Sequence, residues 1–110
     1  MLRKELVAAS AEPLILSLLA QGESYGYAII QEIKSRSKNR MAWTDGMLYP
    51  VLHRLERKGL IKSRWAEAEN GRKRKYYSIK NDGKRALKKH HEHWSLVSSV
   101  LAGLRKEEYA

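Results

Sequence analysis

The chain has 110 residues, enough for one domain with a modest core, and its hydrophobic share of 43% excludes a disordered chain. No apolar run is long enough to cross a membrane, and the absence of cysteine excludes disulfides and thiolate chemistry. The net charge of +10 at pH 7 favours polyanionic partners, nucleic acid before an anionic membrane. Because no signal-peptide pattern is present, we expect a cytoplasmic protein.

The first predicted helix is marked by apolar residues at helical spacing between Leu14 and Leu19. We expect Ser10 to be its N-cap and Gly22 to end it. Residues 1–10 would then form either a short arm or an extension of this helix.

A second helix is predicted to begin after Ser24, its expected N-cap. Tyr25, Ile29 and Ile33 recur one turn apart, which indicates an apolar stripe. The pattern fades beyond Ser35.

The third predicted helix begins at Thr44 or Asp45 and ends at Gly59. Its apolar residues form one stripe, which we expect to be buried: Leu48, Val51, Leu52 and Leu55. The remaining surface presents Met47, Tyr49, Pro50, His53, Arg54 and Arg57. Because Pro50 lies beyond the first turn, either the helix start is irregular or the helix begins later.

Residues 60–79 change to a β pattern. Runs of β-branched and aromatic residues flank the Asn70-Gly71 pair, which favours positive φ in a tight two-stranded hairpin. Four basic residues follow its tip: Arg72, Lys73, Arg74 and Lys75. Between Arg54 and Lys75 basic residues far outnumber acids, which indicates a nucleic-acid contact rather than an ordinary solvated surface.

The last predicted helix starts near Asn81 and runs to about Lys106. Residues spaced alternately three and four apart form an a/d seam: Leu87, His90, Trp94, Val97, Leu101 and Leu104. A lone terminal helix seldom needs so regular a seam. We therefore expect it to pack against a second copy in a homodimer.

Three helices, a hairpin and a long helix predict a mostly α fold with a small β-hairpin, in the α+β class. Residues 1–80 would form a winged helix-turn-helix domain and residues 81–110 a dimerisation helix. The third helix fits the major groove of double-stranded DNA, where its exposed residues meet base edges and phosphates. The basic run at 72–75 would follow the neighbouring backbone or minor groove.

A series of short motifs resembles the PadR family of transcriptional regulators over nearly the whole chain. The motifs are Tyr25-Gly26-Tyr27, Gly46-Met47-Leu48-Tyr49-Pro50, Arg54-Leu55-Glu56, Gly59-Leu60-Ile61, Gly71-Arg72-Lys73-Arg74-Lys75-Tyr76-Tyr77 and, more loosely, Asn81-Asp82-Gly83. A single C-terminal helix is similar to the small subgroup of that family, which includes multidrug-responsive repressors.

The resemblance implies a homodimeric repressor that releases DNA when a small aromatic or amphipathic effector binds. Trp94 matches a tryptophan that, in multidrug-sensing relatives, lies in the dimer interface and stacks on flat ligands. The chain departs from the family pattern at Met47, where a small hydroxyl residue is usual, and at Lys73, where proline is common. It also departs at Lys80, where threonine normally caps the last helix, which leaves Asn81 as the expected cap.

Several features have a second interpretation. Trp94 either stacks on an effector or only packs in the seam. His90, His91 and His93 lack the further ligands of a zinc site, so we expect no metal. The aromatic residues Trp43, Trp65, Tyr76 and Tyr77 either stack on single-stranded bases or, as we expect, pack the sheet onto the helices.

No catalytic constellation or glycine-rich phosphate loop is present, so we expect neither an enzyme nor a bound cofactor. The alternative function is a basic architectural or RNA-binding protein that responds to no effector.

Overall fold

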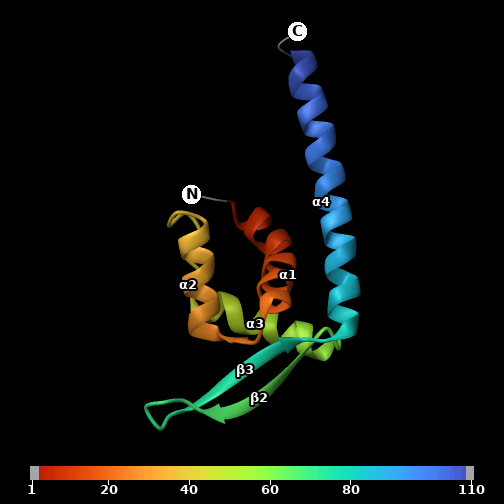
Figure 1. Cartoon of the computed structure of the whole chain (residues 1–110). Coiled ribbons are helices and arrows are strands. Elements are labelled where there is room, and N and C mark those ends of the chain that lie inside the picture. Colours follow the sequence, from red (N-terminus) through yellow and green to blue (C-terminus); the bar gives the residue numbers. More distant parts are fainter. Residues whose placement is uncertain (1–2, 109–110) are drawn as a thin grey trace.

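A computed structural model describes residues 3–108 (Figure 1). In chain order its elements are α1 (Lys4–Gln21), β1 (Ser24–Tyr25), α2 (Gly26–Arg36), α3 (Asp45–Arg57), β2 (Ile61–Glu67), β3 (Lys73–Ile79) and α4 (Asn81–Glu108). The predicted fold class is confirmed: a winged helix with a long C-terminal helix.

The first three helices gather above a small antiparallel sheet, and α4 rises from the sheet as a rod (Figure 1). The strands are arranged in the order β1-β3-β2. The β2–β3 hairpin, which we call the wing, projects beneath the helices (Figure 1). The molecule is elongated, with extents of 61 × 30 × 21 Å.

One apolar core joins α1, α2, α3, the sheet and the first turns of α4. The predicted stripe of α3 is confirmed, since Leu48, Leu52 and Leu55 are fully buried and Val51 packs at its edge. The largest fully buried side chains are Tyr77, Ile15, Leu16, Ile29, Leu48, Leu52, Leu55 and Ile61.

The predicted start of the first helix is wrong. Helix α1 begins at Lys4, with Arg3 at the N-cap, so residues 4–10 extend the helix and residues 1–2 lie outside the described part. Instead of capping, the Ser10 hydroxyl donates back to the carbonyl of Leu6 at 2.7 Å. Pro13 is inside the helix, and the Ala9 carbonyl that it leaves without an amide partner belongs to an exposed residue.

The predicted cap of the second helix is also wrong. Ser24 and Tyr25 form the short strand β1, which pairs with Tyr77 and Tyr76 of β3. Helix α2 begins at Gly26 and its N-cap is Tyr25, without a side-chain hydrogen bond. The sheet therefore has a third strand that the hairpin prediction lacked.

Helix α3 begins as predicted at its Thr44 cap, whose hydroxyl accepts a hydrogen bond from the amide of Met47 at 3.3 Å. Pro50 lies within a regular helix, so neither an irregular nor a later start is needed. The Gly46 carbonyl that loses its bond to Pro50 belongs to an exposed residue, so Pro50 leaves no buried carbonyl unpaired there.

The loop of the wing is longer than the predicted tight turn. The Gly71 amide donates to the Ala68 carbonyl at 2.9 Å, and the Ala68 amide donates to the Arg72 carbonyl at 2.8 Å. Gly71 alone takes the left-handed conformation, with φ of 79°, while the Asn70 side chain accepts from the Arg72 amide. This geometry is a three-residue loop with a glycine bulge.

The start of α4 is anchored to the sheet. The Lys80 carbonyl accepts the first helical bond, from the Lys84 amide, so Lys80 rather than Asn81 occupies the cap position. Gly83 allows the helix to touch the strand, because a Cβ there would overlap the carbonyl oxygen of Leu60. The direction of α4 is thereby fixed by backbone contact.

Candidate nucleic-acid interface

Helix α3 packs its inner face into the core and leaves its outer face exposed. Met47 and Tyr49 are exposed on it, and four further residues predicted for DNA contact are exposed with them: Pro50, His53, Arg54 and Arg57. The helix therefore presents one continuous polar and aromatic surface, with two arginines in its last turn.

Tyr49 has a second contact that the sequence did not reveal. Its hydroxyl lies against Gly26 at the start of α2, where a Cβ would overlap it. Its ring lies 6.4 Å from that of His53. The glycine in the Tyr25-Gly26-Tyr27 motif thus lets α2 and α3 approach each other at the entrance to the helix-turn-helix.

The basic run of the wing divides between two faces because side chains alternate along a strand. Lys75 lies on the face that turns toward α3, with its Nζ 5.6 Å from the centre of the Tyr77 ring. Arg74 lies on the opposite face, where its guanidinium is 4.0 Å from the centre of the Tyr25 ring. Arg72 and Lys73, nearer the tip, are both exposed.

Arg64 is held on that opposite face by an acid. It donates two hydrogen bonds to the Glu23 carboxylate, at 2.6 and 2.8 Å, and lies over the Tyr76 ring. The hydrogen bond from Arg64 lowers the pKa of Glu23. Among residues 3–108, Arg64 is therefore the wing cation that forms an ion pair with a carboxylate.

The aromatic residues predicted to pack the sheet onto the helices do not all do so. Tyr77 and Trp43 are buried in the core, as predicted, and Tyr76 is half-buried against Tyr25 with their ring centroids 5.6 Å apart. Trp65 contradicts the prediction, because 64% of it is exposed. The strand carries this residue beyond the cover of α3.

The a/d seam of α4 is divided by its surroundings. Leu87 belongs to the core of its own chain, and His90 contacts Glu12 of α1. The upper four positions of the seam are exposed: Trp94, Val97, Leu101 and Leu104. Leu96 and Val100 add to this surface, so the helix from residue 91 to 108 has an apolar face that residues 3–108 leave uncovered.

Glu12 connects three helices at the base of α4. Its carboxylate lies 2.6 Å from Nε2 of His90 and accepts a hydrogen bond from Nζ of Lys58, just after α3, at 3.0 Å. Burial raises the pKa of Glu12, but the hydrogen bonds from His90 and Lys58 outweigh it, so the pKa is lowered overall. No sequence pattern signals this contact, because its members are far apart in the chain.

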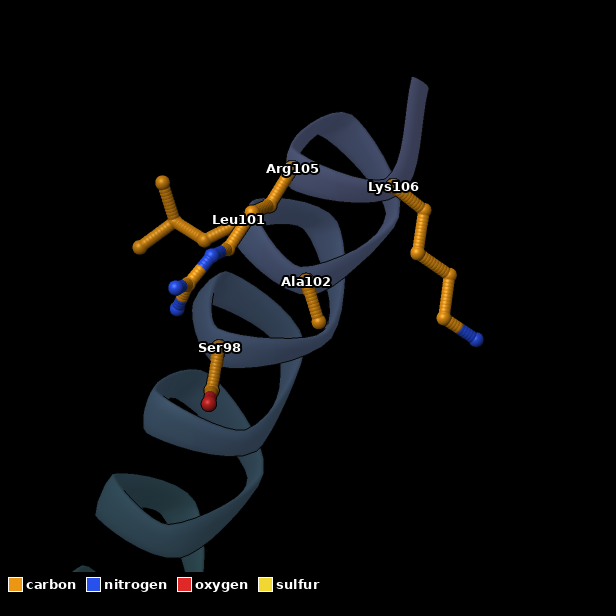
Figure 2. A pocket seen from close by; sticks show the side chains of 5 residues that line it. All are labelled: Ser98, Leu101, Ala102, Arg105 and Lys106. Atoms are coloured by element: carbon orange, nitrogen blue, oxygen red, sulfur yellow. The ribbon is translucent and has the colours of Figure 1, made fainter. Parts of the chain in front are cut away.

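Small side chains hollow the surface of α4 above Trp94. One shallow depression is lined by Trp94, Ser95, Ser98, Ser99 and Ala102. The next is lined by Ser98, Leu101, Ala102, Arg105 and Lys106 (Figure 2). In Figure 2 the Arg105 side chain extends back along the helix toward Ser98, whereas Lys106 points away to the other side.

Residues 3–108 contain neither a metal site nor a membrane-spanning helix. No group of three or more histidines and acids there could hold a metal ion. No helix in that part of the chain is long and apolar enough to span a membrane.

A three-helix cluster with an exposed third helix and a basic wing defines a winged-helix DNA-binding protein. Residues 15–89 match the transcriptional regulator PadR-like family, and the chain belongs to that family. Its members are transcriptional regulators, which implies regulation through DNA binding.

Individual relatives are similar to this chain along most of its length. An uncharacterised protein from Lysinibacillus sphaericus is 34% identical over 92% of this chain and 93% of its own length. A solved transcriptional regulator from Clostridium thermocellum is 32% identical, with a TM-score of 0.83 over 92% of this chain and 95% of that one. A PadR-like transcriptional regulator from Bacillus cereus is 28% identical, with a TM-score of 0.80 over 92% and 96%.

Proposed function

We propose that this regulator binds a specific DNA operator as a homodimer and represses transcription until a small planar aromatic molecule releases it. Residues 1–80 supply the DNA-binding unit, and the chain from Asn81 onward supplies the dimerisation helix. The observation that carries the proposal is the pairing of a basic, exposed winged-helix surface with an uncovered apolar face on α4.

DNA contact is assigned to the exposed face of α3 and to the wing. We assign base contacts to Arg54 and His53, and their exposure on the face opposite the buried stripe supports this assignment. Lys73 and Lys75 would contact phosphates beside the segment that α3 enters. Neutralising several phosphates makes such binding fall steeply with salt.

Dimerisation is assigned to the exposed part of the a/d seam. Val97, Leu101 and Leu104 are exposed to solvent. Each Å² of apolar surface that a second copy buries contributes roughly 25 cal/mol to the free energy of association. Leu87 and His90, at the lower end of the seam, already have partners in their own chain. The interface in this proposal therefore extends from Trp94 toward the C-terminus.

Effector binding is assigned to Trp94. Trp94 is 40% exposed and lines a shallow depression together with serines and Ala102. In this proposal a flat ring lies in that depression against the indole. A two-fold axis along α4 would place two such indoles on opposite sides of one guest. His90 lies one turn before Trp94 on α4 and contacts Glu12, which also accepts a hydrogen bond from Lys58 at the end of α3. In this proposal, a shift of α4 caused by the effector would be transmitted to the recognition helix through these contacts.

Arg54→Ala tests the DNA-binding assignment. If Arg54 reads a base, the change costs about 1–3 kcal/mol on a duplex that the wild type selects from a randomised pool, and much less on a random duplex. Equal losses on both would reduce Arg54 to a phosphate contact. Equal wild-type affinity for every duplex would instead favour the architectural alternative.

Trp94→Ala tests the effector assignment. DNA binding and dimer mass should persist while tryptophan emission no longer responds to planar aromatic dyes. Dissociation of the dimer would make Trp94 a packing residue only. Wild-type emission that is unchanged across a varied dye panel would also remove the effector site.

A further inference from the structure

We propose that Trp65 is a DNA-contacting residue, whose indole lies against the deoxyribose rings and minor-groove edge beside the segment bound by α3. This inference rests on the proposed function and adds a contact that is apolar rather than ionic. Trp65 lies in β2, outside both the recognition helix α3 and the basic run at residues 72–75.

The register of the wing determines the direction in which Trp65 points. Ile61, Ser63 and Trp65 alternate along β2 and therefore share one face of the sheet. Ile61 is buried in the core, and the Ser63 hydroxyl donates to Glu56 of α3 at 2.6 Å. The face that carries Trp65 is thus the face that packs under the recognition helix.

Trp65 lies one step farther out on that face than the helix reaches. Ser63 pairs with Tyr77, which is buried, whereas Trp65 pairs with Lys75 at the next position. Burial, together with the neighbouring Tyr49 and Glu56 of α3, raises the pKa of Tyr77. The exposed indole therefore begins where the cover of the recognition helix ends.

The charges around Trp65 suit a polyanion. The Lys75 ammonium lies 5.9 Å from the centre of the indole ring, and Lys73 follows on the same face, opposite Glu67. Arg72 is exposed at the tip. An apolar partner protein would have to desolvate these cations, whereas duplex DNA offers phosphates to them and sugar rings to the indole.

The expected contribution is a term that does not depend on salt. Covering an exposed indole with sugar and base surface removes apolar area from water, and Trp65→Ala should lower affinity roughly 5- to 50-fold. No counterion is released by this contact, so the slope of log K against log salt should stay that of the wild type. Lys75→Gln should instead reduce the magnitude of that slope by about 1.

The test measures binding of full-length wild type, Trp65→Ala, Trp65→Phe and Lys75→Gln to a duplex selected from a randomised pool, at several salt concentrations. Trp65→Phe should retain part of the affinity. Unchanged thermal unfolding of Trp65→Ala would show that the loss comes from binding, as its exposure predicts. Unchanged affinity of Trp65→Ala, or a reduced slope like that of Lys75→Gln, would overturn the proposal.

Fluorescence provides a second measurement. In a Trp94→Phe background, the emission of Trp65 is the part that disappears when Trp65 is also changed to Phe. The selected duplex should quench or shift this Trp65 emission. A shift with anionic phosphatidylglycerol vesicles, and none with DNA, would mean that the indole serves a membrane surface and would overturn the proposal. If the wild type binds no duplex, both the proposed function and the Trp65 contact are contradicted. If the wild type binds a duplex and Trp65→Ala does not change the affinity, only the Trp65 contact is contradicted.

Discussion

The two ends of this molecule treat apolar residues in opposite ways. Between Ala11 and Leu87, the helices and the sheet bury their aliphatic stripes in one core, and the large apolar side chains left exposed there are Tyr27, Met47, Tyr49 and Trp65. From residue 91 to 108, every residue of α4 is exposed, including Leu101 and Leu104. A stripe that is buried within its own chain stabilises the fold, whereas a stripe left open offers apolar surface to a partner such as the second copy that we propose.

Comparing Leu52→Ala with Leu101→Ala tests this difference between the two ends with the largest expected effect. Leu52 is fully buried, so its truncation should lower the free energy of unfolding by about 3 kcal/mol at any protein concentration. Leu101 is 62% exposed, and its truncation should act mainly through the concentration dependence of unfolding. Urea unfolding at several protein concentrations measures both. Equal, concentration-independent losses would mean that the end of α4 packs within its own chain.

The two glycines of α4 offer a matched pair with opposite signs. Gly83→Ala should cost about 1–3 kcal/mol, because the new Cβ would meet the Leu60 carbonyl and lie 2.7 Å from Cγ1 of Ile79. Gly103 has no atom within 4 Å of a Cβ, so Gly103→Ala should add about 0.5–1 kcal/mol through helix propensity. Thermal unfolding midpoints decide. A fully stable Gly83→Ala protein would contradict the packing of α4 on the strand.

Glu12→Gln probes the junction between the two ends. Replacing the carboxylate that His90 and Lys58 share should cost about 1–2 kcal/mol at pH 7. The folded pKa of Glu12 lies below its unfolded value, so its contribution is present above about pH 4.3 and is lost as the pH falls through the folded pKa. The gap in stability between wild type and variant should therefore close in acid.

A control for this effect exists on α2. Glu32 forms an exposed pair with Arg36, and Glu32→Gln should change stability by less than about 0.5 kcal/mol. Losses of equal size at Glu12 and Glu32 would show that the junction has no special role.

Tyr77→Phe is expected to have the smallest effect. Among the described residues the Tyr77 hydroxyl has no hydrogen-bond partner, although it is buried. Removing it should leave the free energy of unfolding unchanged or raise it by up to about 1 kcal/mol, measured by urea unfolding. A clear loss of stability would reveal a hydrogen bond to that hydroxyl.

Periodicity predicted what depends on neighbouring residues. The buried stripe of α3 and its Thr44 cap follow from local spacing and chemistry, and so does the wing around Gly71. Serine was a poor guide to helix starts. The Ser10 hydroxyl donates to a carbonyl of the preceding turn, and Ser24 belongs to a strand because it pairs with the distant Tyr77.

Contacts between distant segments could not be read from one sequence. The two residues of β1 are too few to show a period, and the junction at Glu12 joins three separate helices. Trp65 was misplaced for a related reason. Trp65 shares a face of the sheet with the buried Ile61, but only the reach of α3 in space shows that this face is uncovered at Trp65.

The central claim is that the open face of α4 brings two winged-helix domains onto one operator. Sedimentation equilibrium of the full chain with a duplex selected from a randomised pool tests it most directly. We predict two chains per duplex, twice the chain mass without DNA, and a selected sequence with two inverted half-sites about one helical turn apart, or a multiple of it. One chain per duplex, with a monomer in solution and no repeated half-site, would contradict the account.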